Sequence, residues 1–97
     1  MAEDVVELVK NEPRGRYELR ADGKTVGFLT YRVLGGVVEL IHTEVPPEHG
    51  GKGFGGRLAD YALGDIRDSG LQVKPTCPFV ARHIGRRPEY APLVVSD

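Results

Sequence analysis

The sequence has a single cysteine, no tryptophan and no long apolar run. One cysteine, Cys77, can form neither a disulfide within the chain nor a multi-cysteine metal site, and such use is typical of a reducing compartment. The start of the chain, Met1 to Asp4, is acidic, and the apolar runs are too short for a signal-peptide core or a membrane span. We therefore expect a cytoplasmic protein with no membrane partner.

Neither sign of charge is in excess. The chain has 13 lysines and arginines against 14 aspartates and glutamates, which gives a formal net charge of -1. This balance provides no overall attraction to nucleic acid, so we expect no nucleic-acid partner. A length of 97 residues is enough for one hydrophobic core, and no repeat or linker divides the chain. We expect one domain over residues 1–97, as a monomer or weak dimer.

The first half of the chain has the turn residues and alternation of antiparallel strands. We predict strands over residues 5–10, 16–20, 25–33 and 37–45. The pair Asp22-Gly23 favours a type I′ turn, because that turn needs positive φ at both positions. The fourth strand has apolar residues on both faces, which is typical of a strand covered on both sides. The first half is therefore predicted to be an antiparallel meander.

The second half turns from strand to helix after Pro46-Pro47. A helix is predicted over residues 54–69, and Gly70 is suited to the left-handed position that ends it. A strand over residues 71–74 then lies parallel to the fourth, which makes a βαβ unit. A second helix over residues 79–87 follows, and residues 90–95 could add an edge strand. The predicted fold class is α/β (α+β): a mixed sheet of five to six strands with two main helices.

Glycines are concentrated from Gly50 to Gly56, between a strand end and a helix start. Backbone amides are accessible there, and the first N–H groups of a helix carry the positive end of its dipole. A phosphate or pyrophosphate is favoured at such a place, and Lys52 and Arg57 add flanking positive charge. The alternative is that the glycines only allow a tight loop to pack.

Two nucleotide-binding motifs fit this turn poorly. A P-loop needs a lysine and then serine or threonine after its last glycine, and this chain lacks that sequence. The pattern G-x-G-x-x-G matches Gly51, Gly53 and Gly56, but the dinucleotide fold also needs an acidic residue ~20 positions further on, where the chain has Lys74. The predicted meander also disagrees with the strand order of that fold.

Several stretches together match one family pattern. They are residues 50–55 (GGKGFG), His42–Pro47 (HTEVPP), Pro75–Phe79 (PTCPF) and Arg87–Tyr90 (RPEY). With these residues the chain resembles the GNAT superfamily of N-acetyltransferases, and within it a small single-domain branch. The acyl-coenzyme A signature of that family reads Arg or Gln, two residues, Gly, one residue, then Gly or Ala. Here Gly50 stands at its first position, which removes a side-chain contact to the pyrophosphate and keeps the backbone N–H.

The resemblance implies acetyl-coenzyme A as cofactor and transfer of its acetyl group to a primary amine, on a protein lysine or a small molecule. It places the pantetheine arm beside the strand end at Glu44 and Val45, and the diphosphate on the glycine turn. The cofactor-binding residues expected from it are Val45, Gly50, Gly51, Lys52, Gly53, Phe54, Gly55, Gly56 and Arg57. The rival interpretation is a catalytically silent acyl-coenzyme A sensor or interaction module.

Three residues are candidates for the chemistry. Cys77 lies at the cap of the second helix, where N–H groups and the dipole stabilise a thiolate. In the branch that the chain resembles, the matching cysteine is the proposed catalytic residue, either as covalent acyl carrier or as acid-base group. His42 and Glu44 lie two apart on one strand and share a face, so either could take a proton from the amine. The alternatives are a space-filling thiol, a core histidine and a solvent-exposed glutamate.

Other polar residues have weaker cases. The scattered histidines lack metal-ligand spacing, so no metal site is expected. Tyr90, which the resemblance places near the cofactor channel, could protonate the departing thiolate. Arg82, Arg86 and Arg87 either stabilise the end of the second helix or contact a 3′-phosphate of the cofactor or an acidic partner.

Overall fold

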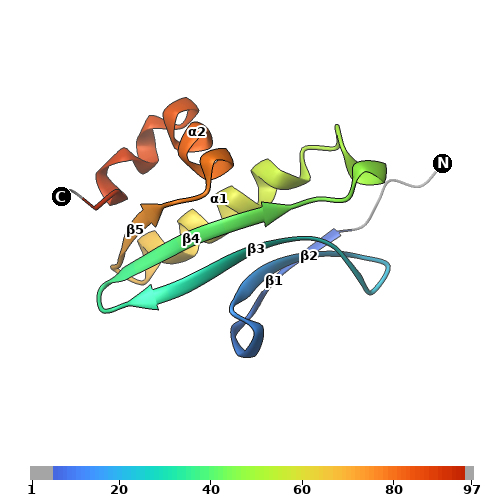
Figure 1. The fold of residues 1–97 in the computed structure, drawn as a ribbon, viewed down its shortest axis with the longest axis horizontal. Coiled ribbons are helices and arrows are strands. Elements are labelled where there is room, and N and C mark those ends of the chain that lie inside the picture. The colour runs from blue at the N-terminus through green and yellow to red at the C-terminus, as the bar shows by residue number, and fades with distance from the viewer. Residues whose placement is uncertain (1–5, 96–97) are drawn as a thin grey trace.

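The structure is a computed structural model that describes residues 6–95. Five strands form one sheet in the order β1-β2-β3-β4-β5 (Figure 1). Their bounds are β1 Val6–Asn11, β2 Arg16–Ala21, β3 Lys24–Leu34, β4 Val37–Glu44 and β5 Gln72–Pro75. The α-helices are α1 (Phe54–Asp68) and α2 (Pro78–Arg86), and 3-10 turns η1 (Glu12–Arg14), η2 (Pro47–His49) and η3 (Pro88–Leu93) connect or follow these elements. The predicted mixed sheet with two main helices is confirmed; residue 5, where the first strand was expected to begin, lies outside the described residues.

The pairing follows the predicted order. Strands β1 to β4 pair antiparallel, and β5 pairs parallel with β4 after the α1 crossover. Asp22 and Gly23 have φ of 54° and 77°, as the type I′ turn requires, and Gly70 closes α1 with φ 73°. These positions confirm the turn chemistry that set the strand boundaries.

The possible sixth strand does not form. Residues 88–93 make the 3-10 turn η3 instead, and only Val94 forms a bridge to Val73 on the outer edge of β5. Pro88 and Pro92 explain the difference, because a proline cannot donate a hydrogen bond to a sheet ladder.

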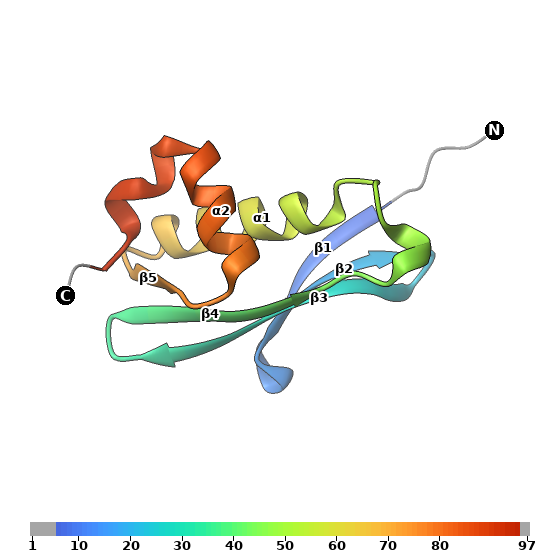
Figure 2. The same ribbon diagram turned by 45° about the horizontal axis from the view of Figure 1, so that its top comes forward.

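Both α-helices cover the same face of the sheet (Figure 2). The long helix α1 lies across β2 to β5, and α2 lies over β4 and β5 beside it. Between the helices and the sheet lies one apolar core, which includes Tyr17, Leu19, Leu29, Leu40, Leu58, Leu63, Ile66, Val73 and Val80. The opposite face of the sheet carries no helix within residues 6–95, and we call it the helix-free face.

Strand β4 contains a bulge that corrects one prediction. Thr30 of β3 pairs with His42, and the next residue, Tyr31, pairs with Leu40, so Ile41 has no partner in the ladder. The extra residue shifts the side-chain alternation, and both Leu40 and Thr43 therefore face the helices. The shift explains why Val45 lies on the helix side together with Leu40, although strict alternation would put the two residues on opposite faces. The expectation that both sides of the strand are covered is wrong.

A buried carboxylate lies on the helix-free face. Glu18 of β2 is 1% exposed, and its oxygens accept hydrogen bonds from Arg16 at 2.6 Å, Arg20 at 2.6 Å and Asn11 at 3.1 Å. Burial alone would raise the pKa of Glu18, but these donors outweigh it and lower that pKa to about 2. The two ion pairs lie within β2, and the hydrogen bond from Asn11 ties β1 to β2 on the face without helices.

A glycine inside α1 offers a stabilising substitution. Gly64 lies in the third turn, and a Cβ added there would meet only the Arg67 Nη2 atom, at 3.7 Å, an ordinary contact. We expect Gly64→Ala to raise the free energy of unfolding by ~0.5–1 kcal/mol, because alanine loses less backbone entropy in a helix. Urea denaturation would measure the shift, and a lower midpoint would contradict the expectation.

Candidate functional site: a glycine-lined pocket beside a buried thiol

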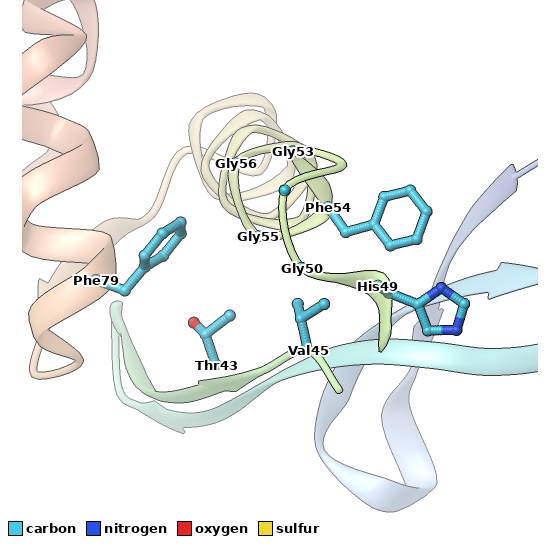
Figure 3. Close-up of a pocket in the computed structure, with 10 residues that line it drawn as sticks. Thr43, Val45, His49, Gly50, Gly53, Phe54, Gly55, Gly56 and Phe79 are labelled. Atoms are coloured by element: carbon cyan, nitrogen blue, oxygen red, sulfur yellow. The ribbon is translucent and has the colours of Figure 1, made fainter. Parts of the chain in front are cut away.

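A pocket of about 440 Å³ opens between the end of β4, the glycine turn and the first turn of α2 (Figure 3). Its far end is formed by Thr43 and Phe79, and its sides by the strand end and the turn. The residues that line it are Thr43, Val45, His49, Gly50, Gly51, Gly53, Phe54, Gly55, Gly56 and Phe79. The glycine turn and the fourth strand end, predicted to meet at one site, do lie together.

The glycine turn places helix amides at the pocket. Gly51 and Gly53 have φ of 81° and 76°, values that side chains with a Cβ rarely adopt, and Gly53 caps α1. The first bond of the helix runs from the Arg57 N–H to the Gly53 carbonyl, 3.1 Å. The N–H groups of residues 54–56 consequently have no partner inside the helix, and they are suited to bind an anion.

Gly55 and Gly56 have a packing role as well. A Cβ on Gly55 would lie 2.8 Å from the Phe79 ring, and one on Gly56 would lie 3.6 Å from the His83 ring. The missing side chain at Gly55 therefore allows α2 to approach the start of α1 closely. Gly51 and Gly53 serve backbone conformation and Gly55 serves packing, and the anion site at this turn stays a prediction.

The charged residues of the turn lie outside the lining set. The Lys52 Nζ atom is 3.2 Å from His49 Nδ1 and 5.6 Å from the centre of the Phe54 ring. Arg57 is exposed on the first turn of α1. Both are close enough in sequence to flank a bound anion, but the pocket wall itself is made by glycines, by the apolar residues Val45, Phe54 and Phe79, and by Thr43 and His49.

Cys77 caps α2 directly behind the pocket. It is 4% exposed, its N–H donates to the Leu40 carbonyl at 2.9 Å, and Pro78 begins the helix after it. Its Sγ atom lies 3.4 Å from the Oγ1 atom of Thr43. Burial raises the pKa of the thiol, but hydrogen bonds from Thr43 and from backbone N–H groups in the first turn of α2 outweigh burial, so the net pKa lies below its usual value.

His42 and Glu44 lie on the other side of β4. Their side chains are 60% and 59% exposed, and His42 Nε2 is 3.3 Å from Glu44 Oε1. The prediction that they share a face is confirmed, and the alternative of a core histidine is wrong. Successive side chains of a strand point to opposite faces, so His42 and Glu44 lie on the face of β4 away from Thr43. The structure therefore does not bring them together with the Cys77 thiol.

A polar cluster joins the two helices next to the pocket. Asp60 of α1 accepts a hydrogen bond from the Tyr90 hydroxyl at 3.2 Å and lies 2.7 Å from His83 Nε2 of α2. Arg87 Nη2 lies 3.7 Å from the same carboxylate. The rings of Phe79, His83 and Tyr90 stack in sequence. Tyr90 is therefore a packing residue that does not line the pocket.

Thr43 and Phe79 line the pocket but were not predicted as site residues, although they lie within the matched stretches HTEVPP and PTCPF. Two weaker signals point to them. The parallel register pairs Leu40 with Pro75, so a residue just beyond Leu40 must lie near Cys77. The bulky Phe79 lies in the first turn of α2, and the neighbouring helix α1 begins with glycines. A large side chain on one helix and missing side chains on the other suggest that the two helix starts pack together.

Two further properties concern residues 6–95 alone. They contain no group of three or more His, Cys, Asp or Glu side chains arranged to hold a metal ion. None of their helices combines the length and apolar character needed to cross a bilayer.

Comparison with known proteins identifies relatives of similar fold. The chain is 27% identical to Protein NATD1 of Gallus gallus over 85 residues, which is 86% of this chain and 77% of that protein, and it matches Protein NATD1 of Mus musculus equally. A solution structure of a Staphylococcus aureus protein described as GCN5-like superposes with a TM-score of 0.71 at 20% identity, covering 94% of this chain and 89% of the other. Ribosomal-protein-alanine N-acetyltransferase from Brucella melitensis gives 0.59 at 22% identity, covering 84% and 62%. These structures establish the fold.

The family itself is established by sequence. The sequence model described as GCN5-related N-acetyl-transferase matches residues 16–93, which include the sheet from β2 onward, the glycine turn and both helices. The protein therefore belongs to the GCN5-related N-acetyltransferase family.

Proposed function

We propose that the pocket binds acetyl-coenzyme A, with the diphosphate on the glycine turn and the pantetheine arm along Val45 toward Thr43. The proposal is carried by one observation. Backbone amides at the start of α1 and apolar side chains line one continuous pocket, which ends at Thr43, the residue whose hydroxyl is hydrogen-bonded to the Cys77 thiol. An anionic head and a long, mostly uncharged arm match that arrangement. Lys52 and Arg57 belong to the same stretch of the chain, and they would add positive charge beside the diphosphate.

The proposed reaction transfers the acetyl group to a primary amine of a protein lysine or a small molecule. Cys77 is its proposed catalytic residue, because its thiol lies next to the end of the pocket and its pKa is lowered. His42 and Glu44 could accept the proton of the amine only if the amine reaches the thioester from the helix-free face of β4. We further expect a cytoplasmic single domain that acts as a monomer or weak dimer.

A second candidate is a sensor that binds acetyl-coenzyme A without turnover. It is favoured by the burial of Cys77 and by the position of the His42–Glu44 pair away from that thiol. Both functions need the same cofactor site, so turnover distinguishes them.

Calorimetric titration with coenzyme A and acetyl-coenzyme A tests the shared step. We expect heat of binding with a dissociation constant of ~1–100 μM, within the range of enzyme cofactors. A panel of amines and lysine peptides, read by thiol release and by a mass gain of about 42 Da on the acceptor, then tests transfer. Absence of binding heat would contradict both functions, and binding without transfer to any amine would favour the sensor.

A further inference from the structure

We infer that Thr43 relays a proton from Cys77 to the departing coenzyme A sulfur, so that Cys77 acts as a general acid and carries no acetyl group. This inference rests on the proposed function and deepens it. It adds a residue, Thr43, to the chemistry and decides between the two roles open to the thiol.

The pocket gives access to Thr43 and not to the Cys77 thiol. Cys77 is 4% exposed and does not line the pocket, whereas Thr43 does. A covalent carrier would have to bring its sulfur to within ~3–3.5 Å of the thioester carbon. At this end of the pocket the wall is made by Thr43 and Phe79, and Figure 3 shows the Thr43 hydroxyl on the side toward Phe79. Thr43, rather than the thiol, is therefore the group that a bound thioester meets.

The contact between Thr43 and Cys77 is fixed from both sides. The bulge at Ile41 turns Thr43 toward the helices, and the Cys77 N–H is tied to the Leu40 carbonyl at 2.9 Å. Pro78 at the start of α2 restricts the backbone that follows the thiol. The 3.4 Å contact between Oγ1 and Sγ thus joins a paired strand to a helix cap, which suits a proton transfer that depends on geometry.

The proton path balances without another reactant. The lone pair of the neutral amine forms the N–C bond to the thioester carbon, and the C–S bond breaks with its electron pair on the coenzyme A sulfur. That sulfur takes the hydroxyl proton of Thr43, and Oγ1 takes the proton of the Cys77 thiol. The proton lost by the acylated nitrogen goes to solvent, and solvent returns one to Cys77. Before transfer the thiol donates to Oγ1; afterwards the hydroxyl donates to the thiolate, so one contact serves both states.

The acidity of the thiol agrees with this direction. An ordinary thiol titrates near ~8.5. The pKa of Cys77 lies below its usual value, since hydrogen bonds to the sulfur outweigh burial, and a proton therefore moves favourably from Cys77 to a coenzyme A thiolate.

A pair of Thr43 variants tests the relay. Thr43→Val keeps the shape and removes the hydroxyl, and we expect kcat to fall ~100-fold, the lower range for a general acid, while KM for acetyl-coenzyme A changes less than ~3-fold. Thr43→Ser keeps a hydroxyl and should recover most of kcat. Cys77→Ala should lose as much as Thr43→Val, and the double variant should lose no more than either, because both remove one path.

Three results would overturn the inference. The first is a Thr43→Val enzyme with wild-type kcat. The second is an acetyl adduct of about 42 Da on Cys77, trapped by acid quench, that passes to added amine as fast as turnover. The third is an absence of coenzyme A binding in calorimetry, which would overturn the proposed function as well, whereas the first two leave cofactor binding intact and overturn the relay alone.

Discussion

Gly53→Val is expected to weaken binding of acetyl-coenzyme A by ~100-fold or more. Gly53 has φ 76° at the cap of α1, where a residue with a Cβ is strained by roughly 1–2 kcal/mol. The backbone of the valine variant should therefore leave this conformation. The amides that follow Gly53 would then no longer converge on the diphosphate. Losing two charge-assisted hydrogen bonds of ~1.5 kcal/mol each corresponds to that loss of affinity. Calorimetric titration measures it directly.

Gly70→Val is the matched control. Gly70 lies at the other end of the same helix, with φ 73° and no atom within 4 Å of an added Cβ, as at Gly53. Both variants should lose similar stability in urea, and only Gly53→Val should lose cofactor affinity. Equal affinities in the two variants would show that the amides at the start of α1 do not bind the cofactor.

Glu18→Gln is expected to lower the free energy of unfolding at neutral pH by about 3 kcal/mol. The pKa of Glu18 is lowered from 4.5 to about 2 by Arg20, Arg16 and Asn11 against the opposing effect of burial. A shift of that size corresponds to about 3 kcal/mol, a large part of the stability of a small domain. The substitution would also leave two arginines on the helix-free face without their shared carboxylate. Thermal unfolding should show a decrease of ~10–20 °C.

The lowered pKa of Glu18 should also make the stability of the protein depend on pH. Because the folded-state pKa is depressed, the stabilisation is fully present above about 4.5 and is lost as pH falls toward about 2. The wild-type protein should therefore lose more stability across this interval than Glu18→Gln. Glu7→Gln, an exposed substitution on the neighbouring strand, should change stability by less than ~0.5 kcal/mol. Parallel pH curves for wild type and Glu18→Gln would contradict the assignment.

Local chemistry in the sequence was sufficient to predict most of the fold. The Asp22-Gly23 turn, Gly70 and Pro78 each have a backbone requirement that only a few residue types meet, so they mark element ends reliably. The same holds for the glycine turn, since its placement before a helix predicts accessible amides. Its position in the structure, at the wall of the pocket, agrees with that expectation.

Features that depend on distant residues could not be predicted in this way. The bulge at Ile41 is set by how β3 and β4 pair, and the meeting of Asp60 with His83 depends on where α2 packs. Thr43 illustrates the consequence. Strict alternation from Val38 and Leu40 would point the Thr43 side chain away from the helices, and the extra residue Ile41 turns it toward them. A prediction from alternating side chains is therefore correct for the part of β4 before Ile41 and wrong for the part after it.

The unpaired Ile41 divides β4 into two stretches that can change independently during evolution. Upstream, Val38 and Leu40 are constrained by the volume available beneath the helices. Downstream, Thr43 and Val45 line the pocket, whereas His42 and Glu44 are exposed on the opposite face. A lineage can therefore vary the chemistry of the downstream stretch without rebuilding the interior, whereas loss of the single extra residue would exchange which side chains line the pocket.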